Sequence, residues 1–307
     1  MIKQQAVSIV ESALERLKGA RGAEQGGRSA TPTEPPERAQ PVPLPAGRGR
    51  SRIPPPIRWA SQAPPVDLDF ARLEAAGLCP PEPLARRLRD EFRAIRREVV
   101  GATLEMGASG QAVGPIVVVT SAGPGDGKSH TALNLALSIA GQGVYDVLLI
   151  DADFVKRTIS VACDLGDRPG LAELLTHPTV SFLDYAYPTG VQRLHILPAG
   201  ARSRSAHDLF APARVAALFD VIRTAMAEHI VIVDTPPILV SSDTAVVLDA
   251  AGQVLLVVRA GSSLQDAVRE ALGRIRKTLP VGVILNDWSP LLPSEKKTYT
   301  SYDEYAQ

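Results

Sequence analysis

A glycine-rich stretch near the middle of the chain has the residue types and spacing of a phosphate-binding loop. An apolar run leads into Ala122-Gly-Pro-Gly-Asp-Gly-Lys-Ser129, and a helical pattern follows. Successive backbone N–H groups of such a loop, together with the positive end of the helix, bind the phosphates of a nucleotide. In this motif Lys128 contacts the β- and γ-phosphates and the Ser129 hydroxyl binds Mg²⁺. Ala122 departs from the motif, which usually has a glycine at that position.

The predicted phosphate contacts extend over the whole loop and into the first turn of the helix. They are Gly123, Pro124, Gly125, Asp126, Gly127, Lys128, Ser129 and His130. His130 directly follows the metal-binding serine, and we expect it to approach the nucleotide without taking part in catalysis. Asn286, after the last apolar run, is a candidate to approach the nucleotide base or to form a turn.

Three aspartates complete the predicted site. Asp151 and Asp153 end one apolar run, and Asp234 ends another. In an open parallel sheet the carboxyl ends of the strands meet at one edge, where these side chains would face the loop. Mg²⁺ prefers oxygen ligands, so we predict that Ser129, Asp153 and Asp234 bind the metal. Asp151 is a candidate to orient or deprotonate an attacking hydroxyl, which makes Lys128, Asp151 and Asp153 the predicted catalytic residues.

These residues together predict a Mg-ATP site of the P-loop class. An ATPase and a phosphotransferase are both compatible with them, because both chemistries depend on positioning and electrostatic stabilisation of the same phosphoryl group. The choice between the two activities requires other features of the chain.

Strands and helices that alternate along the chain must position these residues. The strand candidates are apolar runs at residues 116–120, 147–151, 194–197, 229–234, 253–258 and 282–285. The helix candidates lie at residues 84–106, 129–140, 171–175, 212–228, 243–248 and 264–279. Continuous apolar runs are typical of parallel strands that are covered on both faces. The predicted fold is therefore α/β and P-loop NTPase-like, a mostly parallel sheet with helices on both faces.

A proline-rich region separates this fold from the N-terminus. About half of the 26 prolines fall between Thr31 and Pro80, in a stretch with little apolar periodicity. Such a composition cannot offset the conformational entropy lost on folding. The predicted organisation is a short amphipathic helix at residues 1–19, a disordered linker at 20–66, the nucleotide-binding domain at 67–292 and a flexible tyrosine-rich tail at 293–307.

Composition narrows the class of protein further. The chain of 307 residues has a formal net charge of zero, so no global field favours nucleic acid, and no nucleic-acid partner is expected. No apolar stretch reaches the roughly 18 residues needed to cross a bilayer, and we expect a cytoplasmic protein. Cys79 and Cys163 lie in dissimilar contexts, which favours reduced structural cysteines over a disulfide.

The acidic motifs Asp151-Ala-Asp153 and Asp234-Thr-Pro-Pro237, with the loop before them, resemble those of the bacterial tyrosine kinases that control capsule and exopolysaccharide synthesis. The resemblance covers residues 84–292 and implies a P-loop fold, ATP and Mg²⁺ as cofactors, and a role in polymerisation and export of a polysaccharide. Similarity to the exosortase-associated subgroup of these autokinases is carried by residues 2–17, 66–77 and 91–96.

The resemblance also implies how such a kinase assembles and what it modifies. The family forms a ring through a Glu-x-x-Arg-x-x-Arg helix, which Asp90, Arg93 and Arg96 match except that Asp replaces Glu. The shorter acid would weaken a salt bridge across the ring interface. The phosphoacceptors of the family are clustered tyrosines at the C-terminus, which correspond here to Tyr299, Tyr302 and Tyr305.

Other members of the family have a transmembrane activator segment, either fused or on a separate protein, and no fused one is visible in this sequence. The resemblance therefore implies a membrane polysaccharide co-polymerase, or chain-length regulator, as a separate activator. This partner would recruit the kinase to the inner face of the membrane. A cognate tyrosine phosphatase is a further partner of the kind that the family implies.

Two alternatives stand beside the kinase. A partition or septum-placement ATPase shares the fold and both acidic motifs, but it usually has a second lysine in the loop, where this chain has Gly123. The other is a catalytically weak, nucleotide-binding scaffold of a polysaccharide machine. The motifs do not indicate a loss of catalysis, since Lys128, Ser129, Asp151, Asp153 and Asp234 are all present; Ala122, Asp90 and the late arginine of Phe154-Val-Lys-Arg157 depart from the family pattern and leave weak activity as an alternative.

Overall fold

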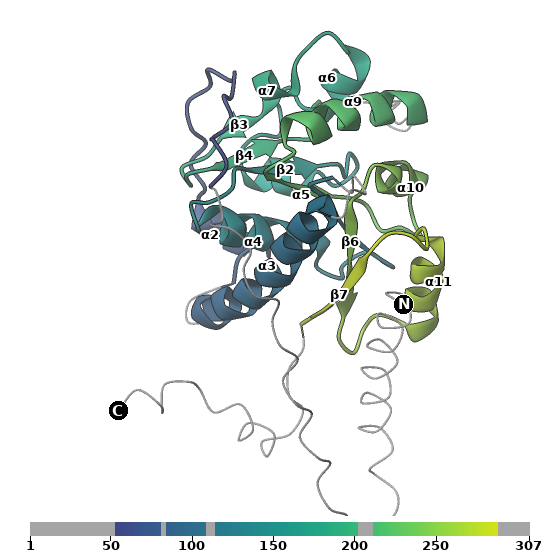
Figure 1. The fold of residues 1–307 in the computed structure, drawn as a ribbon. Helices are drawn as coiled ribbons and strands as arrows, with labels where there is room; N and C mark the ends of the chain where they lie inside the picture. The colour runs from purple at the N-terminus through teal and green to yellow at the C-terminus, as the bar shows by residue number, and fades with distance from the viewer. Residues whose placement is uncertain (1–52, 81–83, 109–113, 202–210, 288–307) are drawn as a thin grey trace, which may run out of the picture. The chain divides into compact units, whose positions relative to one another are not determined.

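A sheet of seven strands forms the centre of the described structure (Figure 1). Its strand order is β3-β4-β2-β5-β1-β6-β7, and all neighbouring pairs are parallel except β3 with β4. The strands are β1 (Ile116–Ser121), β2 (Val147–Asp151), β3 (Tyr187–Pro188), β4 (Leu194–Leu197), β5 (Ile230–Asp234), β6 (Gln253–Arg259) and β7 (Val281–Asn286). The mostly parallel sheet predicted from the apolar runs is therefore confirmed.

The computed structural model describes residues 53–80, 84–108, 114–201 and 211–287. The predicted helix at 1–19, the linker residues 20–52 and the predicted tail at 293–307 lie outside the described residues. The proposed acceptors lie outside them as well, namely Tyr299, Tyr302 and Tyr305. Within the described part of the chain, no helix is long and apolar enough to cross a membrane.

Helices cover both faces of the sheet. α2 to α5 contribute to a hydrophobic cluster on one face, and α6, α7, α9, α10 and α11 contribute to a second cluster on the other. The bounds are α2 (Phe70–Ala75), α3 (Leu84–Ala108), α4 (Lys128–Ala140), α5 (Thr158–Ala162), α6 (Leu171–Thr176), α7 (Phe182–Tyr185), α9 (Pro212–Ala225), α10 (Ser242–Asp249) and α11 (Gln265–Arg274). The predicted α/β layers are confirmed.

Successive residues of the central strands alternate between the two clusters. In β1, Ile116 and Val118 pack with α9, α10 and α11, whereas Val117 and Val119 pack with α3 and α4. Every residue of β1, β2 and β5 is buried. Both faces of these strands require apolar side chains, which explains the continuous apolar runs of the sequence.

The folded domain begins earlier in the chain than the predicted end of the linker at residue 66. Ile57 donates its backbone N–H to Asp146 Oδ2 (2.8 Å), and the ring of Trp59 stacks on a histidine of β4 with centroids 3.9 Å apart. Val66 donates its backbone N–H to β3 (2.8 Å). The prediction of a disordered linker is wrong for residues 56–66. Their high proline content misleads because contacts with Asp146, β4 and β3 hold these residues in place without any regular structure of their own.

The apolar patterns do not predict α2, α5, α7 and β3. Each of these elements has six residues or fewer and lacks the continuous apolar run that marks the short strands that the sequence does predict. Two predicted helices are shorter in the structure, since α9 ends at Ala225 and α11 ends at Arg274. Cys79 and Cys163 are both free and buried, as expected.

Candidate active site

The predicted phosphate loop connects the end of β1 to the start of α4. Gly125 and Gly127 have left-handed backbone angles, with φ of 85° and 98°. A β-carbon at Gly127 would also overlap the side-chain amide of Asn286. The left-handed backbone therefore favours glycine at position 127, and any side chain there would also have to displace the Asn286 amide.

Asp126 ties this loop to two other elements. Its Oδ2 accepts a hydrogen bond from the Gly123 N–H (3.2 Å), within the loop, and its Oδ1 accepts one from the Ser263 hydroxyl (2.8 Å), after β6. The amide of Asn286, at the end of β7, donates to the backbone carbonyl of Asp126 (2.9 Å). These three bonds, which we call the Asp126 latch, hold the loop in shape without a ligand.

Lys128 begins α4 and lies within the protein rather than on its surface. Its exposed fraction is 6%. Burial lowers the pKa of Lys128, while the nearby charges of Asp234 and Asp153 act in the opposite direction. A lysine in this position supplies a point charge to a phosphate that enters the loop.

Adjacent strands bring two of the predicted acids side by side. Asp151 of β2 and Asp234 of β5 are paired residues in the parallel register, and Val119 of β1 is the partner of Asp234 on the other side. Both aspartates are fully buried. The sheet therefore places both acids at the end of β1, from which the phosphate loop departs.

Asp151 is enclosed by hydrogen-bond donors. Its Oδ2 accepts from the backbone N–H (2.9 Å) and hydroxyl (2.7 Å) of Ser160, and its Oδ1 accepts from the N–H of Asp153 (3.2 Å). Burial raises the pKa of Asp151 to about 6, and the hydrogen bonds from Ser160 limit that rise. A carboxylate of this kind is ionised at neutral pH and more basic than a surface aspartate.

Asp153 lies at the start of the turn that follows β2. Its Oδ1 accepts a hydrogen bond from the backbone N–H of Lys156 (2.9 Å), and its exposed fraction is 5%. Its charge acts on Lys128 and on Asp234. Asp153 therefore belongs to the same electrostatic cluster as the loop lysine.

Asp234 lacks hydrogen bonds of the kind that Asp151 and Asp153 accept. Neither carboxylate oxygen of Asp234 has a hydrogen-bond partner among the described residues, although both are buried. Burial raises the pKa of Asp234 well above its ordinary value, and the charge of Asp151 acts in the same direction; a weak interaction with the Ser129 hydroxyl, outside normal hydrogen-bond geometry, and the charge of Lys128 oppose it. Buried oxygens without donors are suited to a cation.

The residues fit a magnesium-bound nucleotide. Among the described residues no group of three or more His, Cys, Asp or Glu side chains is arranged to hold a metal ion by itself. Mg²⁺ usually takes only one or two carboxylates and completes its shell with a hydroxyl, water and phosphate oxygens. Asp234, Asp153 and Ser129 can supply the protein part of such a shell.

Two predicted residues have different surroundings from those expected. The His130 ring nitrogen lies 3.2 Å from the Gly77 carbonyl, and its ring lies 6.2 Å from that of Phe92, so the side chain contacts the segment between α2 and α3. Asn286 takes part in the Asp126 latch. The sequence predicts either a contact with the nucleotide base or a turn at this residue, and it does not predict this bond to the phosphate loop.

The residues matched to the ring-forming helix are divided between two roles. Asp90 and Arg93 form an exposed ion pair on α3 (3.4 Å). Arg96 instead donates to the carbonyl (2.8 Å) and hydroxyl (3.2 Å) of Ser138 on α4. Arg96 therefore joins α3 to the helix that begins in the phosphate loop.

Sequence reasoning did not identify two supporting residues, Ser160 and Ser263. Ser160 follows Asp151 by nine residues on α5, and Ser263 follows Asp126 by 137 residues. No spacing rule connects such pairs, because the contacts depend on how the loops fold at the edge of the sheet.

The chain is similar in sequence to known bacterial kinases, although no family model matches it. It is 33% identical over 214 residues to the EpsB protein of Ralstonia solanacearum, named as a tyrosine-protein kinase; the match covers 67% of this chain and 27% of EpsB, so the chain spans about a quarter of that relative. It is 30% identical over 221 residues to the tyrosine-protein kinase YwqD of Bacillus subtilis, covering 71% of this chain and 89% of YwqD.

Solved structures agree with these relatives. The BceF tyrosine kinase domain superposes with a TM-score of 0.57 at 27% identity, covering 71% of this chain and 86% of that domain. The septum site-determining protein MinD of Pyrococcus horikoshii, complexed with Mg-ADP, superposes with a TM-score of 0.50 at 19% identity, covering 60% of this chain and 76% of MinD. MinD therefore shares the fold alone. Because YwqD is matched over most of its length, the chain belongs to the bacterial tyrosine-protein kinase family.

Proposed function

We propose that the protein is an ATP-dependent protein-tyrosine autokinase. It would transfer the γ-phosphoryl group of ATP to tyrosines in the C-terminal tail of a neighbouring copy, namely Tyr299, Tyr302 and Tyr305. The observation that carries this proposal is Asp234, a buried carboxylate without a donor that lies beside Lys128 and Ser129 at a preformed phosphate loop. The tyrosines supply an acceptor that a plain ATPase does not need.

Each residue of the site has a role in this reaction. The loop N–H groups and Lys128 bind the phosphates, while Ser129, Asp153 and Asp234 would hold Mg²⁺, which supplies positive charge to the transferred group when bound. The tyrosine oxygen forms a bond to the γ-phosphorus, the bond between that phosphorus and the bridging oxygen breaks, and ADP leaves. Asp151 accepts the proton of the tyrosine hydroxyl, since its raised pKa of about 6 makes it a better base than an exposed aspartate.

The test uses the full chain and follows phosphotyrosine by mass spectrometry after incubation with Mg-ATP. The parent is expected to acquire phosphate on the tail, and the Lys128→Met variant is expected to acquire none. A triple Tyr→Phe variant at 299, 302 and 305 should also lose the signal, whereas Tyr185→Phe, which changes a tyrosine of α7, should keep it. ATP hydrolysis without phosphotyrosine would instead indicate a partition-type ATPase, and neither activity would indicate a scaffold.

A mixing experiment separates transfer between copies from transfer within one copy. The Lys128→Met protein retains its tyrosines, and the triple Phe protein retains its catalytic residues. If the tail of a neighbour is the substrate, a mixture of the two should place phosphate on the Lys128→Met chain. Absence of phosphate on both chains, with an active parent, would contradict transfer between copies.

The proposed assembly is a ring in which α3 takes part. Asp90 and Arg93 are exposed on this helix and available to a neighbouring copy, whereas Arg96 already bonds to Ser138. Arg93→Ala should reduce the oligomer in sedimentation, whereas Arg269→Ala, a change on α11, should leave it unchanged. An unchanged oligomer in Arg93→Ala would contradict a ring through α3.

The proposed biological role is the control of exopolysaccharide or capsule polymerisation and export, with membership of the exosortase-associated subgroup as the finer assignment. A membrane polysaccharide co-polymerase would activate the kinase and recruit it from the cytoplasm to the inner face of the membrane, and a cognate tyrosine phosphatase would reverse the modification. The support for this role is the resemblance of the acidic motifs. Co-purification of the kinase with such a membrane protein would test it.

A further inference from the structure

The backbone around Asp234 is held by hydrogen bonds to neighbouring elements. The Asp234 carbonyl accepts from the N–H of Ala152 (2.8 Å), directly after β2. Thr235 donates both its N–H (3.2 Å) and its hydroxyl (3.0 Å) to the Val119 carbonyl of β1. The carboxylate oxygens of Asp234, by contrast, have no hydrogen-bond partner among the described residues. The place of this carboxylate therefore depends on how firmly the backbone beside it is held.

Two threonine hydroxyls meet on the carbonyl of Pro236, two residues after Asp234. Thr120 Oγ1 of β1 donates to this carbonyl (3.0 Å), and Thr244 Oγ1 of α10 donates to it as well (2.8 Å). A backbone carbonyl has two lone pairs and a proline has no N–H, so these two bonds use the whole hydrogen-bonding capacity of Pro236. We call this arrangement of Thr120, Thr244 and Pro236 the Pro236 clamp.

Both threonines of the clamp are fully buried. The exposed fraction of each is 0%. Position 120 continues the run Val117-Val-Val119, and a valine there would fill a similar volume without a hydroxyl to bury. A buried hydroxyl is unfavourable unless it is bonded, and here each hydroxyl has the Pro236 carbonyl as its acceptor. Compared with valine, each threonine therefore adds a directional bond to the turn after Asp234.

The clamp connects the metal-binding acid to the phosphate loop. Thr120 lies two residues before Ala122, where the loop begins, and Pro236 lies two residues after Asp234. Thr244 lies in α10, so the clamp also ties the turn to a helix that covers the sheet. A movement of the turn away from β1 or α10 would break these bonds. Groups that orient a metal ligand in this way commonly determine metal affinity without touching the metal.

We propose that Thr120 and Thr244 are positioning residues for Mg²⁺, because they hold Asp234 where it can bind the metal together with Ser129. This inference rests on the Mg-ATP site of the proposed function, but not on tyrosine as the phosphate acceptor. Neither hydroxyl is expected to contact the metal or the nucleotide, since both donate to Pro236. Loss of either hydroxyl should weaken Mg²⁺ binding and leave the phosphate loop intact.

The test measures binding of a nucleotide and requires no turnover. The probe is ADP with a fluorescent methylanthraniloyl group, which is titrated with the full-chain protein in EDTA and at increasing concentrations of Mg²⁺. In the parent, Mg²⁺ should tighten the binding of this probe. In Thr120→Val and Thr244→Val, the Mg²⁺ concentration needed for tight binding should rise by about tenfold. Binding in EDTA should equal that of the parent, because the loop is unchanged.

Conservative variants distinguish a lost hydroxyl from a disturbed core. Thr120→Ser and Thr244→Ser keep the donor, so both should respond to Mg²⁺ as the parent does. If Thr120→Val fails to fold, which thermal unfolding would detect, Thr244→Val tests the same carbonyl from α10. A parental response to Mg²⁺ in the folded valine variants would overturn the proposal. A serine variant that responds as weakly as its valine counterpart would also contradict it.

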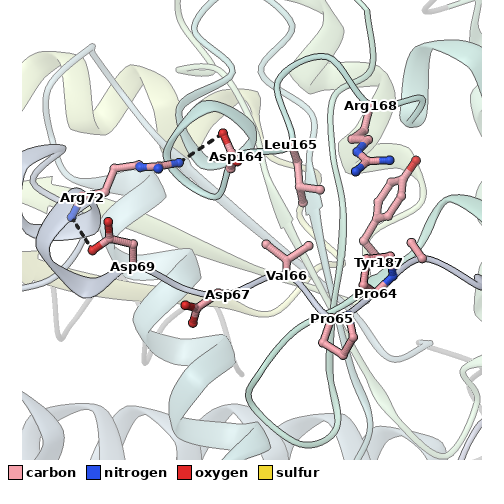
Figure 2. A pocket seen from close by; sticks show the side chains of 11 residues that line it. Pro64, Pro65, Val66, Asp67, Asp69, Arg72, Asp164, Leu165, Arg168 and Tyr187 are labelled. Carbon is pink, nitrogen blue, oxygen red and sulfur yellow. Dashed lines mark hydrogen bonds and ion pairs between the residues drawn. The ribbon is translucent and has the colours of Figure 1, made fainter.

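Thr189→Val is the matched control for the loss of a buried hydroxyl. The Thr189 hydroxyl donates to the Leu194 carbonyl (3.0 Å) between β3 and β4, at the edge of the sheet. Tyr187 of β3 lines the cavity of about 460 Å³ drawn in Figure 2, and no residue of that cavity belongs to the predicted active site. Thr189→Val should respond to Mg²⁺ as the parent does, even if it unfolds at a lower temperature. A tenfold change in this variant, as in Thr120→Val, would show a general loosening of the fold and contradict a specific role of the clamp.

Failure of this proposal and failure of the autokinase function give different results. If the parent forms phosphotyrosine and responds to Mg²⁺, but the valine variants respond equally, the function stands and the positioning role is wrong. If the parent binds the probe equally with and without Mg²⁺, the metal site is wrong and the positioning role with it. If the parent responds to Mg²⁺ but forms no phosphotyrosine, the autokinase function is wrong, and the valine variants still decide the role of the clamp.

Discussion

The two halves of the active site differ in how far they are completed by the protein itself. On the loop side, the polar groups of Asp126 bond to Gly123, Ser263 and Asn286. On the acid side, Asp234 has two buried carboxylate oxygens and no hydrogen-bond partner among the described residues. The loop is thus held by bonds within the protein, whereas the buried carboxylate of Asp234 has no hydrogen-bond donor among the described residues.

This difference indicates where the free energy of ligand binding acts. A preformed loop loses little conformational freedom when phosphates enter, which favours affinity. A buried carboxylate without donors is unfavourable for the folded state, and a bound cation would relieve that cost. The loop side therefore mainly determines nucleotide affinity, and the acid side mainly couples metal binding to stability and catalysis.

The largest effect is expected from Asp234→Asn. Phosphotransfer should fall by at least about 100-fold, because a metal ligand is lost. The ligand-free protein should become more stable at pH 8, by about 1–2 kcal/mol, since the variant has no buried charge at this position. Burial raises the pKa of Asp234 above the ordinary 3.8, so stability of the parent falls as the pH rises through the raised pKa. The measurements are phosphotyrosine formation and thermal unfolding without nucleotide.

The pH dependence provides the internal check on that prediction. The stability gain of Asp234→Asn should shrink as the pH approaches 4, where the carboxyl is protonated in the folded parent. Asp249→Asn changes an exposed aspartate and serves as the control. If the ligand-free Asp234→Asn protein is less stable than the parent at pH 8, the buried charge of Asp234 does not destabilise the folded protein, and the proposed difference between the loop side and the acid side is wrong.

The next largest effect is expected from the Asp126 latch. Asp126→Ala removes the acceptors of the Gly123 N–H and the Ser263 hydroxyl, so the loop should become less ordered before binding. The KM for ATP should rise by about tenfold, with a smaller change in kcat. Asp126→Asn keeps an acceptor for Gly123 and should have an intermediate KM. Steady-state phosphotransfer measures both constants, and an unchanged KM in Asp126→Ala would show that the latch is not needed.

A smaller effect is expected in the pH profile of the acid side. The proposed reaction uses the carboxylate form of Asp151, whose pKa is about 6, so kcat/KM should rise as the pH increases through about 6. Ser160 donates to Asp151 and opposes the rise in its pKa, so Ser160→Ala should move this limb of the profile to higher pH. If kcat/KM rises at the same pH in Ser160→Ala as in the parent, Asp151 is not the titrating group.

The smallest effect is expected from Ser263→Ala. This variant removes one hydrogen bond of the latch and leaves the bonds of Asp126 to Gly123 and Asn286. The KM for ATP should rise by about two- to threefold, in line with the modest net contribution of one hydrogen bond. Ser262→Ala, at the exposed neighbouring residue, should leave the KM unchanged. A KM increase as large as that of Asp126→Ala would show that the latch depends on Ser263 alone.

The sequence predicts the sheet well because strands that are buried on both faces require continuous apolar runs, which are visible in the sequence. The predicted strand at residues 147–151 agrees with β2, and the others agree within one residue at either end. The loop and the acids are equally visible, since their chemistry requires fixed residue types at the ends of strands. The folded segment at 56–66 is missed because it is held by isolated contacts, such as that of Ile57 with Asp146.

The residues that support the site through hydrogen bonds could not be identified from the sequence. Ser160 and Ser263 look like any other serine in the sequence, and Asn286 is compatible with a turn or a base contact. Arg96 matches the pattern of an assembly helix, yet in the structure it bonds to Ser138 within the same chain. A hydrogen bond between residues far apart in sequence follows from the packing of several elements, which periodicity and motif spacing do not describe.

The sequence by itself determines the layered fold, the phosphate loop and the identity of the three aspartates, because hydrophobic periodicity and motif chemistry are local. Only the tertiary structure decides that Asp126 is fully bonded, that Asp151 is enclosed by donors and that the buried carboxylate oxygens of Asp234 are not. These differences arise where loops from separate strands meet. The physical reason is that a buried charge is favourable or unfavourable according to the donors, acceptors and charges packed around it, and that packing exists only in the folded chain.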